Sequence, residues 1–240
     1  MRKILAFTLA ETLIVMGIIG IVSALTLPNL NASTGEKEKV AKVKKIHSNL
    51  QDAFGRAIAI YGPIDEWERG LSSGLYSQEG CDRIMDRLSE FLKVSKSCGN
   101  TITPCFKSNT FNQLHGSAGS SISSLSNSLI LADGTSIGIS YQGAGVHVIF
   151  IDIDGPNKGQ NAFGRDVFAY TRDFSDNTSF FKPAGFDITT DAAIKSQCFA
   201  SGSNCMQWVI TNDNMDYTKA DKDGKCSNGK ILTLTNISCK

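Results

Sequence analysis

The residue whose chemistry most needs an explanation is Glu11, a carboxylic acid inside an apolar run. Between Phe7 and Leu27 no other residue is charged. At about 1.5 Å per residue, a helix of this length spans roughly 30 Å, the thickness of the hydrocarbon core of a bilayer. An acid in that core costs about 2.5 to 3.5 kcal/mol on insertion scales, so we expect Glu11 to have a function and a partner.

A second group of oxygen ligands lies between residues 152 and 166. Asp152, Asp154, Asn157 and Asp166 fall in a glycine-rich loop that follows a predicted strand. Carboxylate and amide oxygens in a flexible loop suit calcium, although Gly155 follows the second acid directly and no Glu closes the loop as in an EF-hand. The same residue types form turns by bonding their own backbone. A calcium site and a turn-rich loop without a cofactor therefore stay open as alternatives.

The third group of residues with a chemical role is the cysteines, which can form disulfides. The seven cysteines all follow the apolar run: Cys81, Cys98, Cys105, Cys198, Cys205, Cys226 and Cys239. This distribution predicts disulfides in an oxidising compartment outside the cytoplasm. Cys98 to Cys105 and Cys198 to Cys205 each enclose six residues, which is short enough for a local disulfide loop. The sequence leaves the connectivity open, and the odd count leaves one thiol without a disulfide partner.

No set of residues indicates catalysis. The segment from Gly70 to Gly74 matches G-x-S-x-G, but no predicted strand precedes it, as a nucleophile elbow requires. HExxH and the phosphate-binding Gly-Lys loop are absent, and His47, His115 and His147 lie too far apart for a zinc motif. With 24 basic and 23 acidic residues, the chain has no general affinity for nucleic acid. We expect no enzymatic activity and no nucleic-acid partner.

Two ordinary interpretations of the N-terminus stay open. Arg2 and Lys3, the apolar run and the small residues Val22-Ser23-Ala24 fit a secretory signal peptide. A plain membrane anchor fits as well. The apolar run is longer than that of a usual signal peptide, and neither interpretation explains Glu11.

The residues around Glu11 resemble a known processing motif. Lys3-Ile4-Leu5-Ala6 followed by Phe7-Thr8-Leu9-Ala10-Glu11 is similar to the cleavage and methylation motif of type IV pilins and type II secretion pseudopilins. The resemblance implies a leader at residues 1–6, cleavage between Ala6 and Phe7, methylation of Phe7 and an assembly role for Glu11. Ala6 stands where the family usually has Gly, and Pro28 stands where the family commonly has a proline. The resemblance covers about the first 30 residues.

The resemblance implies a structural subunit of a type IV pilus or a type II secretion pseudopilus. An alternative is a minor pilin that acts as a binding or adhesion module at a filament tip. Its partners would be other pilin or pseudopilin subunits, the prepilin peptidase and the membrane. The protein would cross the bacterial inner membrane once, with its head extracytoplasmic and its filament in the periplasm or at the cell surface.

An electrostatic argument supports this interpretation of Glu11. If cleavage exposes the amine of Phe7, that amine can pair with Glu11 of a neighbouring, axially shifted subunit. A charge pair in a low-dielectric environment is costly when one partner is missing. Such a pair would therefore set the register between subunits, as a buried polar residue does in a coiled coil.

The elements that position these residues follow from hydrophobic spacing. Residues 7–27 predict a transmembrane helix, and residues 28–61 predict its amphipathic continuation, with a bend near Pro28 or a stretch that extends to Gly35. Apolar residues at spacings of three and four from Val43 to Tyr61 form one stripe. Gly62-Pro63 predicts the end of this helix.

The remaining residues, 62–240, predict an extracytoplasmic globular head. We expect a helix at 81–94, a Ser/Gly-rich loop at 116–128, and a hairpin that joins 129–132 to 137–141 around Asp133-Gly134. The expected elements after the hairpin are a central strand at 146–153, a strand at 167–170, a short helix within 187–198, a buried element at 205–212 and a last strand at 230–238. The fold class is α+β: a long N-terminal helix packed on a small antiparallel sheet.

Overall fold

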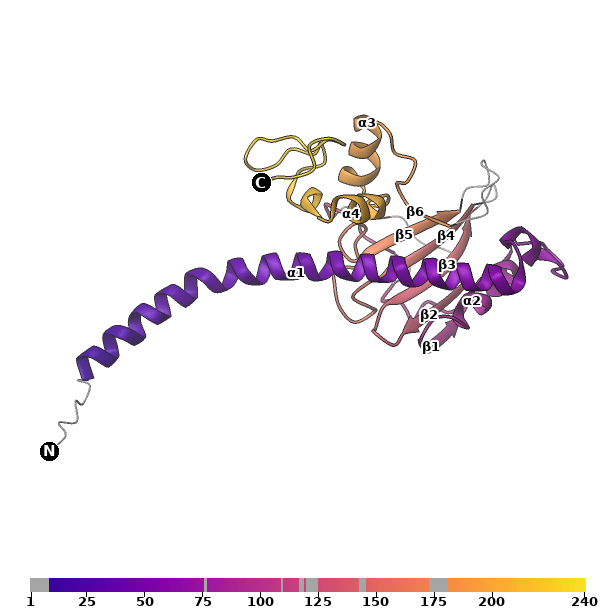
Figure 1. The fold of residues 1–240 in the computed structure, drawn as a ribbon, viewed down its shortest axis with the longest axis horizontal. Coiled ribbons are helices and arrows are strands. Elements are labelled where there is room, and N and C mark those ends of the chain that lie inside the picture. The colour runs from indigo at the N-terminus through magenta and orange to yellow at the C-terminus, as the bar shows by residue number, and fades with distance from the viewer. Residues whose placement is uncertain are drawn as a thin grey trace. The chain divides into compact units, whose positions relative to one another are not determined.

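The structure is a computed structural model that describes residues 9–75, 77–108, 110–116, 119, 125–142, 146–172 and 181–240, without the side chains of 25–34, 68, 142 and 146. The chain divides into two compact units, Met1–Glu38 and Lys39–Lys240. The first unit contains the N-terminal part of helix α1. The second unit, called the head below, contains the rest of α1, a β-sheet and shorter helices (Figure 1).

Helix α1 runs from Leu9 to Tyr61. It is continuous between Pro28 and Gly35, where the sequence only weakly favours helix, and the bend near Pro28 stays a prediction. Across the described part of the chain, no helix is both long enough and apolar enough to cross a membrane. The predicted transmembrane segment, 7–27, begins outside the described residues and stays a prediction.

Within the head, the apolar stripe of α1 is buried as predicted. Its buried members are Val43, Ile46, Leu50, Phe54 and Ala57. The helix ends where Gly62-Pro63 predicts. Gly62 has a positive φ of 78° and donates its N–H to the carbonyl of Ile58 at 2.9 Å, which closes the last turn. Pro63 cannot continue the helix, because its ring would clash with the preceding turn.

The described strands form one antiparallel sheet in the order β1-β2-β3-β4-β5-β6. The strands are β1 (Val94–Gly99), β2 (Asn127–Leu131), β3 (Ser136–Gln142), β4 (Val146–Asp152), β5 (Val167–Arg172) and β6 (Lys182–Pro183). The predicted hairpin is β2–β3, with Leu129 opposite Ile137 and a turn at Asp133-Gly134. The coarse fold class, α+β with an antiparallel sheet, is therefore confirmed.

Strand β4 is central and apolar on both faces, as its sequence predicts. Ile149 and Ile151 belong to the main core, which also contains the stripe of α1 that crosses this face of the sheet (Figure 1). Val148 and Phe150 belong to a second core on the opposite face, together with residues between 105 and 111. The second core is closed by irregular chain, for which the sequence analysis predicted no element.

Helix α2 (Gln78–Ser89) occupies a different range from the predicted 81–94. It begins earlier because Ser77 caps it, accepting a hydrogen bond from the N–H of Gly80. It ends earlier because the chain turns at residues 90–93 and enters β1 at Val94. The predicted loop 116–128 is described only in part, and its last two residues belong to β2.

The C-terminal third is mostly helical and irregular. α3 (Asp191–Ile194) and the π-helical turn η2 (Lys195–Ala200) form the predicted short helix, and α4 (Met206–Asn212) is the predicted buried element. The predicted last strand at 230–238 is wrong. Only Ile231 makes an isolated bridge there, with Lys225. Local bonds, such as the N–H of Asn236 to the hydroxyl of Thr233, use the backbone groups that a strand would need.

Candidate functional site

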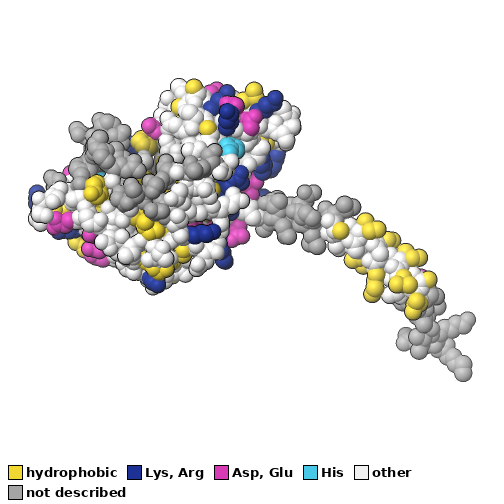
Figure 2. All heavy atoms as spheres, turned by 180° about the vertical axis from the view of Figure 1, so that it is seen from behind, with side chains coloured by type: hydrophobic (Ala, Val, Ile, Leu, Met, Phe, Trp, Pro, Cys, Tyr) yellow, Lys and Arg dark blue, Asp and Glu magenta, His cyan; other side chains and the backbone are white. Residues whose placement is uncertain are grey.

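The described N-terminal part of α1 presents apolar side chains all round its circumference. Nine large hydrophobic residues are each more than half exposed: Leu9, Leu13, Ile14, Val15, Met16, Ile18, Ile19, Ile21 and Val22. Figure 2 shows hydrophobic side chains gathered over this part of the helix. A soluble helix normally has one apolar stripe and one polar face. Among residues 9–24 there is no such polar face, and no described part of the first unit covers this apolar surface.

Glu11 lies in the first turn of α1 as described. A carboxylate there is favoured by the partial positive charge of the helix N-terminus. The predicted cleavage and methylation residues, Ala6 and Phe7, lie outside the described residues. Gly17 and Gly20 face open space, so a second helix can approach the backbone closely at these positions.

The loop between β4 and β5 contains the four predicted calcium ligands. Asp152 is buried, and its Oδ1 accepts the N–H groups of Asp154 at 3.1 Å and Gly155 at 3.0 Å. Asp166 is fully buried, and its two oxygens accept the N–H groups of Asn161 at 2.7 Å and Ala162 at 2.8 Å. Both acids therefore accept hydrogen bonds from backbone N–H groups of their own loop, as expected for a turn-rich loop without a bound ion.

Asp154 faces α1 instead. Its carboxylate pairs with the ammonium groups of Lys42 at 3.0 Å and Lys39 at 3.3 Å. Burial acts to raise the pKa of Asp154, but the two lysines outweigh burial, and the pKa lies below its usual value. Lys39 also donates to the carbonyl of Arg165 at 3.1 Å, so the loop is fastened to the helix at two points.

These contacts bear directly on the predicted calcium site. Burial, together with the neighbouring carboxylate of Asp166, raises the pKa of Asp152 to about 7. Asn157 is exposed, and no described contact joins its side chain to the three aspartates. In the described ranges, no three His, Cys, Asp or Glu side chains are grouped so that they could hold a metal ion. Calcium stays a prediction, and an ion that used Asp154 would compete with two lysines.

The sequence analysis missed Lys39 and Lys42 as partners of this loop. They are 115 and 112 positions away from Asp154, and nothing in their own surroundings distinguishes them from the other lysines of the basic run at 37–45. One signal was present: Lys39 and Lys42 are three residues apart and therefore share a helix face.

The predicted disulfides are present. Cys98 is bonded to Cys105 and Cys198 to Cys205, and a third bond joins Cys226 to Cys239. The remaining cysteine, Cys81, is a buried thiol, and burial raises its pKa to about 11. A thiol with a raised pKa is a poor nucleophile.

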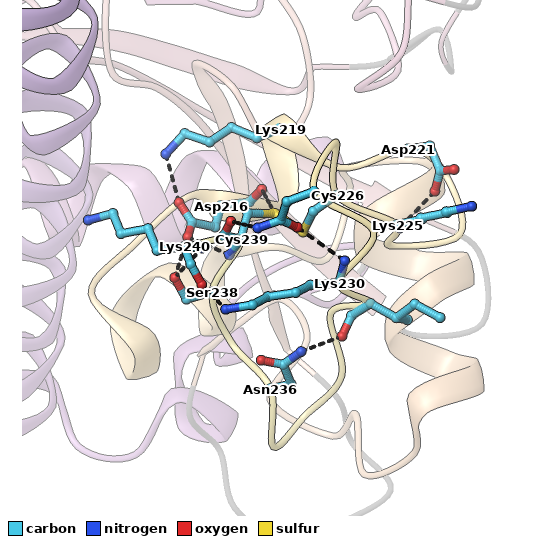
Figure 3. The surroundings of a disulfide bond; sticks show 12 residues. Asp216, Lys219, Asp221, Lys225, Cys226, Lys230, Asn236, Ser238, Cys239 and Lys240 are labelled. Carbon is cyan, nitrogen blue, oxygen red and sulfur yellow. Dashed lines mark hydrogen bonds and ion pairs between the residues drawn. A yellow bond between two sulfur atoms is a disulfide. The ribbon is translucent and has the colours of Figure 1, made fainter.

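The third disulfide fastens the C-terminus to the head (Figure 3). Asp216 lies beside it and accepts hydrogen bonds from the hydroxyl of Ser238, the N–H of Cys239 and the ammonium of Lys219. Burial acts to raise the pKa of Asp216, but these three donors outweigh it and the pKa is lowered. The segment between the two cysteines is therefore held by a covalent bond and by a charged anchor.

Comparisons with protein-family models, curated proteins and solved structures gave no match to this chain. The functional argument therefore rests on the chain's own residues.

Proposed function

We propose that this chain is a structural subunit of an extracytoplasmic filament of the type IV pilus or type II secretion pseudopilus kind, assembled through its N-terminal helix. The observation that carries the proposal is the helix from Leu9 to Ala24, with apolar side chains on every side and the acid Glu11 in its first turn. The similarity of residues 3–11 to a prepilin processing motif agrees with it.

The exposed apolar surface is the physical reason for assembly. Full burial of one Val, Leu, Ile or Met side chain stabilises by about 1.5 to 3 kcal/mol. Nine such side chains are exposed on this segment, so the segment gains free energy by entering a bilayer and again by packing with other helices of its kind. We propose that it first anchors the subunit in the inner membrane and then forms the core of the filament.

Glu11 would select the register of that packing. In an apolar bundle a carboxylate is tolerated only when a positive group meets it. Cleavage after Ala6 would supply that group as the amine of Phe7 of a neighbouring subunit. The pair would be satisfied at one axial offset between the two helices and broken at others.

The N-terminus of the mature protein tests this proposal first. Intact mass and N-terminal sequencing of protein from membranes should identify a chain that begins at methylated Phe7. A chain that begins at Leu25 would instead identify a cleaved signal peptide and would overturn the proposal. A chain that still begins at Met1 would identify a plain anchor.

Filament yield tests the role of Glu11. Glu11→Ala should leave the subunit in the membrane with its head folded but should abolish sheared filaments. Asp187→Ala, which removes an exposed acid of the head, is the matched control and should leave the yield unchanged. Normal filament yield from Glu11→Ala would rule out the proposed role of this carboxylate.

A further inference from the structure

We draw no further inference here: the strongest candidate, the groove of about 520 Å³ that α1 forms with residues 91–93 and 131–133, has charges of both signs in its lining and leucines that are already buried, and nothing in the described part of the chain shows what covers it.

Discussion

His147 should make the stability of the head depend on pH. The side chain is fully buried on β4, and its Nε2 lies 2.9 Å from the carbonyl oxygen of Leu75. Burial, reinforced by the positive charge of Arg172, lowers its pKa from 6.5 to about 4, although the contact with Leu75 acts in the opposite direction. The folded head therefore holds a neutral imidazole at a pH where the unfolded chain already binds a proton.

The sign and size of the effect follow from this difference. The contribution of neutral His147 is fully present above pH 6.5, and it is lost as the pH falls from 6.5 to about 4, since the unfolded chain binds more protons in that interval. A gap of about 2.5 pH units corresponds to about 3 kcal/mol in the free energy of unfolding. That is a large share of the 5 to 15 kcal/mol that stabilises a typical domain.

Urea unfolding of the full-length chain in detergent, followed by the fluorescence of Trp67 and Trp208, measures this free energy. Both indoles are buried in the head, so their signal reports on its unfolding. Between pH 7 and pH 4, His147→Gln should lose about 3 kcal/mol less than the wild type. His115→Gln, the same change at an exposed histidine, is the matched control. Equal losses for wild type and His147→Gln would refute the assignment of this pH dependence to His147.

Three further predictions concern the loop after β4 and the C-terminus. Asp152→Asn should be more stable than the wild type in urea unfolding above pH 7, because the raised pKa of Asp152 means that stability is lost as the pH rises from about 4 to about 7; an advantage that does not grow with pH would contradict this. Calcium, compared with chelator, should raise the melting temperature if residues 152–166 bind the ion, and an unchanged value would leave the turn interpretation. Cys226→Ser with Cys239→Ser should lower the free energy of unfolding by about 3 kcal/mol through loss of loop closure, and a difference below about 1 kcal/mol in urea titration would show that the charged anchor Asp216 suffices.

Local signals in the sequence were sufficient for much of the head. The stripe from Val43 to Tyr61 predicted which side of α1 is buried. Apolar residues at spacings of three and four lie on one side of a helix, and that side packs against the core. Asp133-Gly134 predicted the β2–β3 hairpin, because Asp-Gly favours a tight turn and the alternation of apolar and polar residues beside it favours strands. In both cases the residues that decide the structure are neighbours in the chain.

The elements that the sequence missed depend on distant partners. β1 reads Val-Ser-Lys-Ser-Cys-Gly and lacks apolar alternation, and it is a strand because β2 offers it backbone hydrogen bonds. The segment 230–238 has the composition of a strand, yet it bonds locally, as Asn236 does to Thr233 and Ile231, and the Cys226–Cys239 disulfide closes it into a loop. The lysine pairs on Asp154 likewise exist only once α1 and the loop after β4 come together.

The two edge strands of the sheet, β1 and β6, affect how readily the protein aggregates at high concentration. β1 carries irregularities of register between Val94 and Lys96 and between Ser97 and Gly99, and it presents a lysine to solvent. The opposite edge, β6, has two residues, one of them a proline. Bulges, lysine, proline and short length all obstruct the addition of a foreign strand. These two described edges thus protect the head from amyloid-like stacking when many copies are close together.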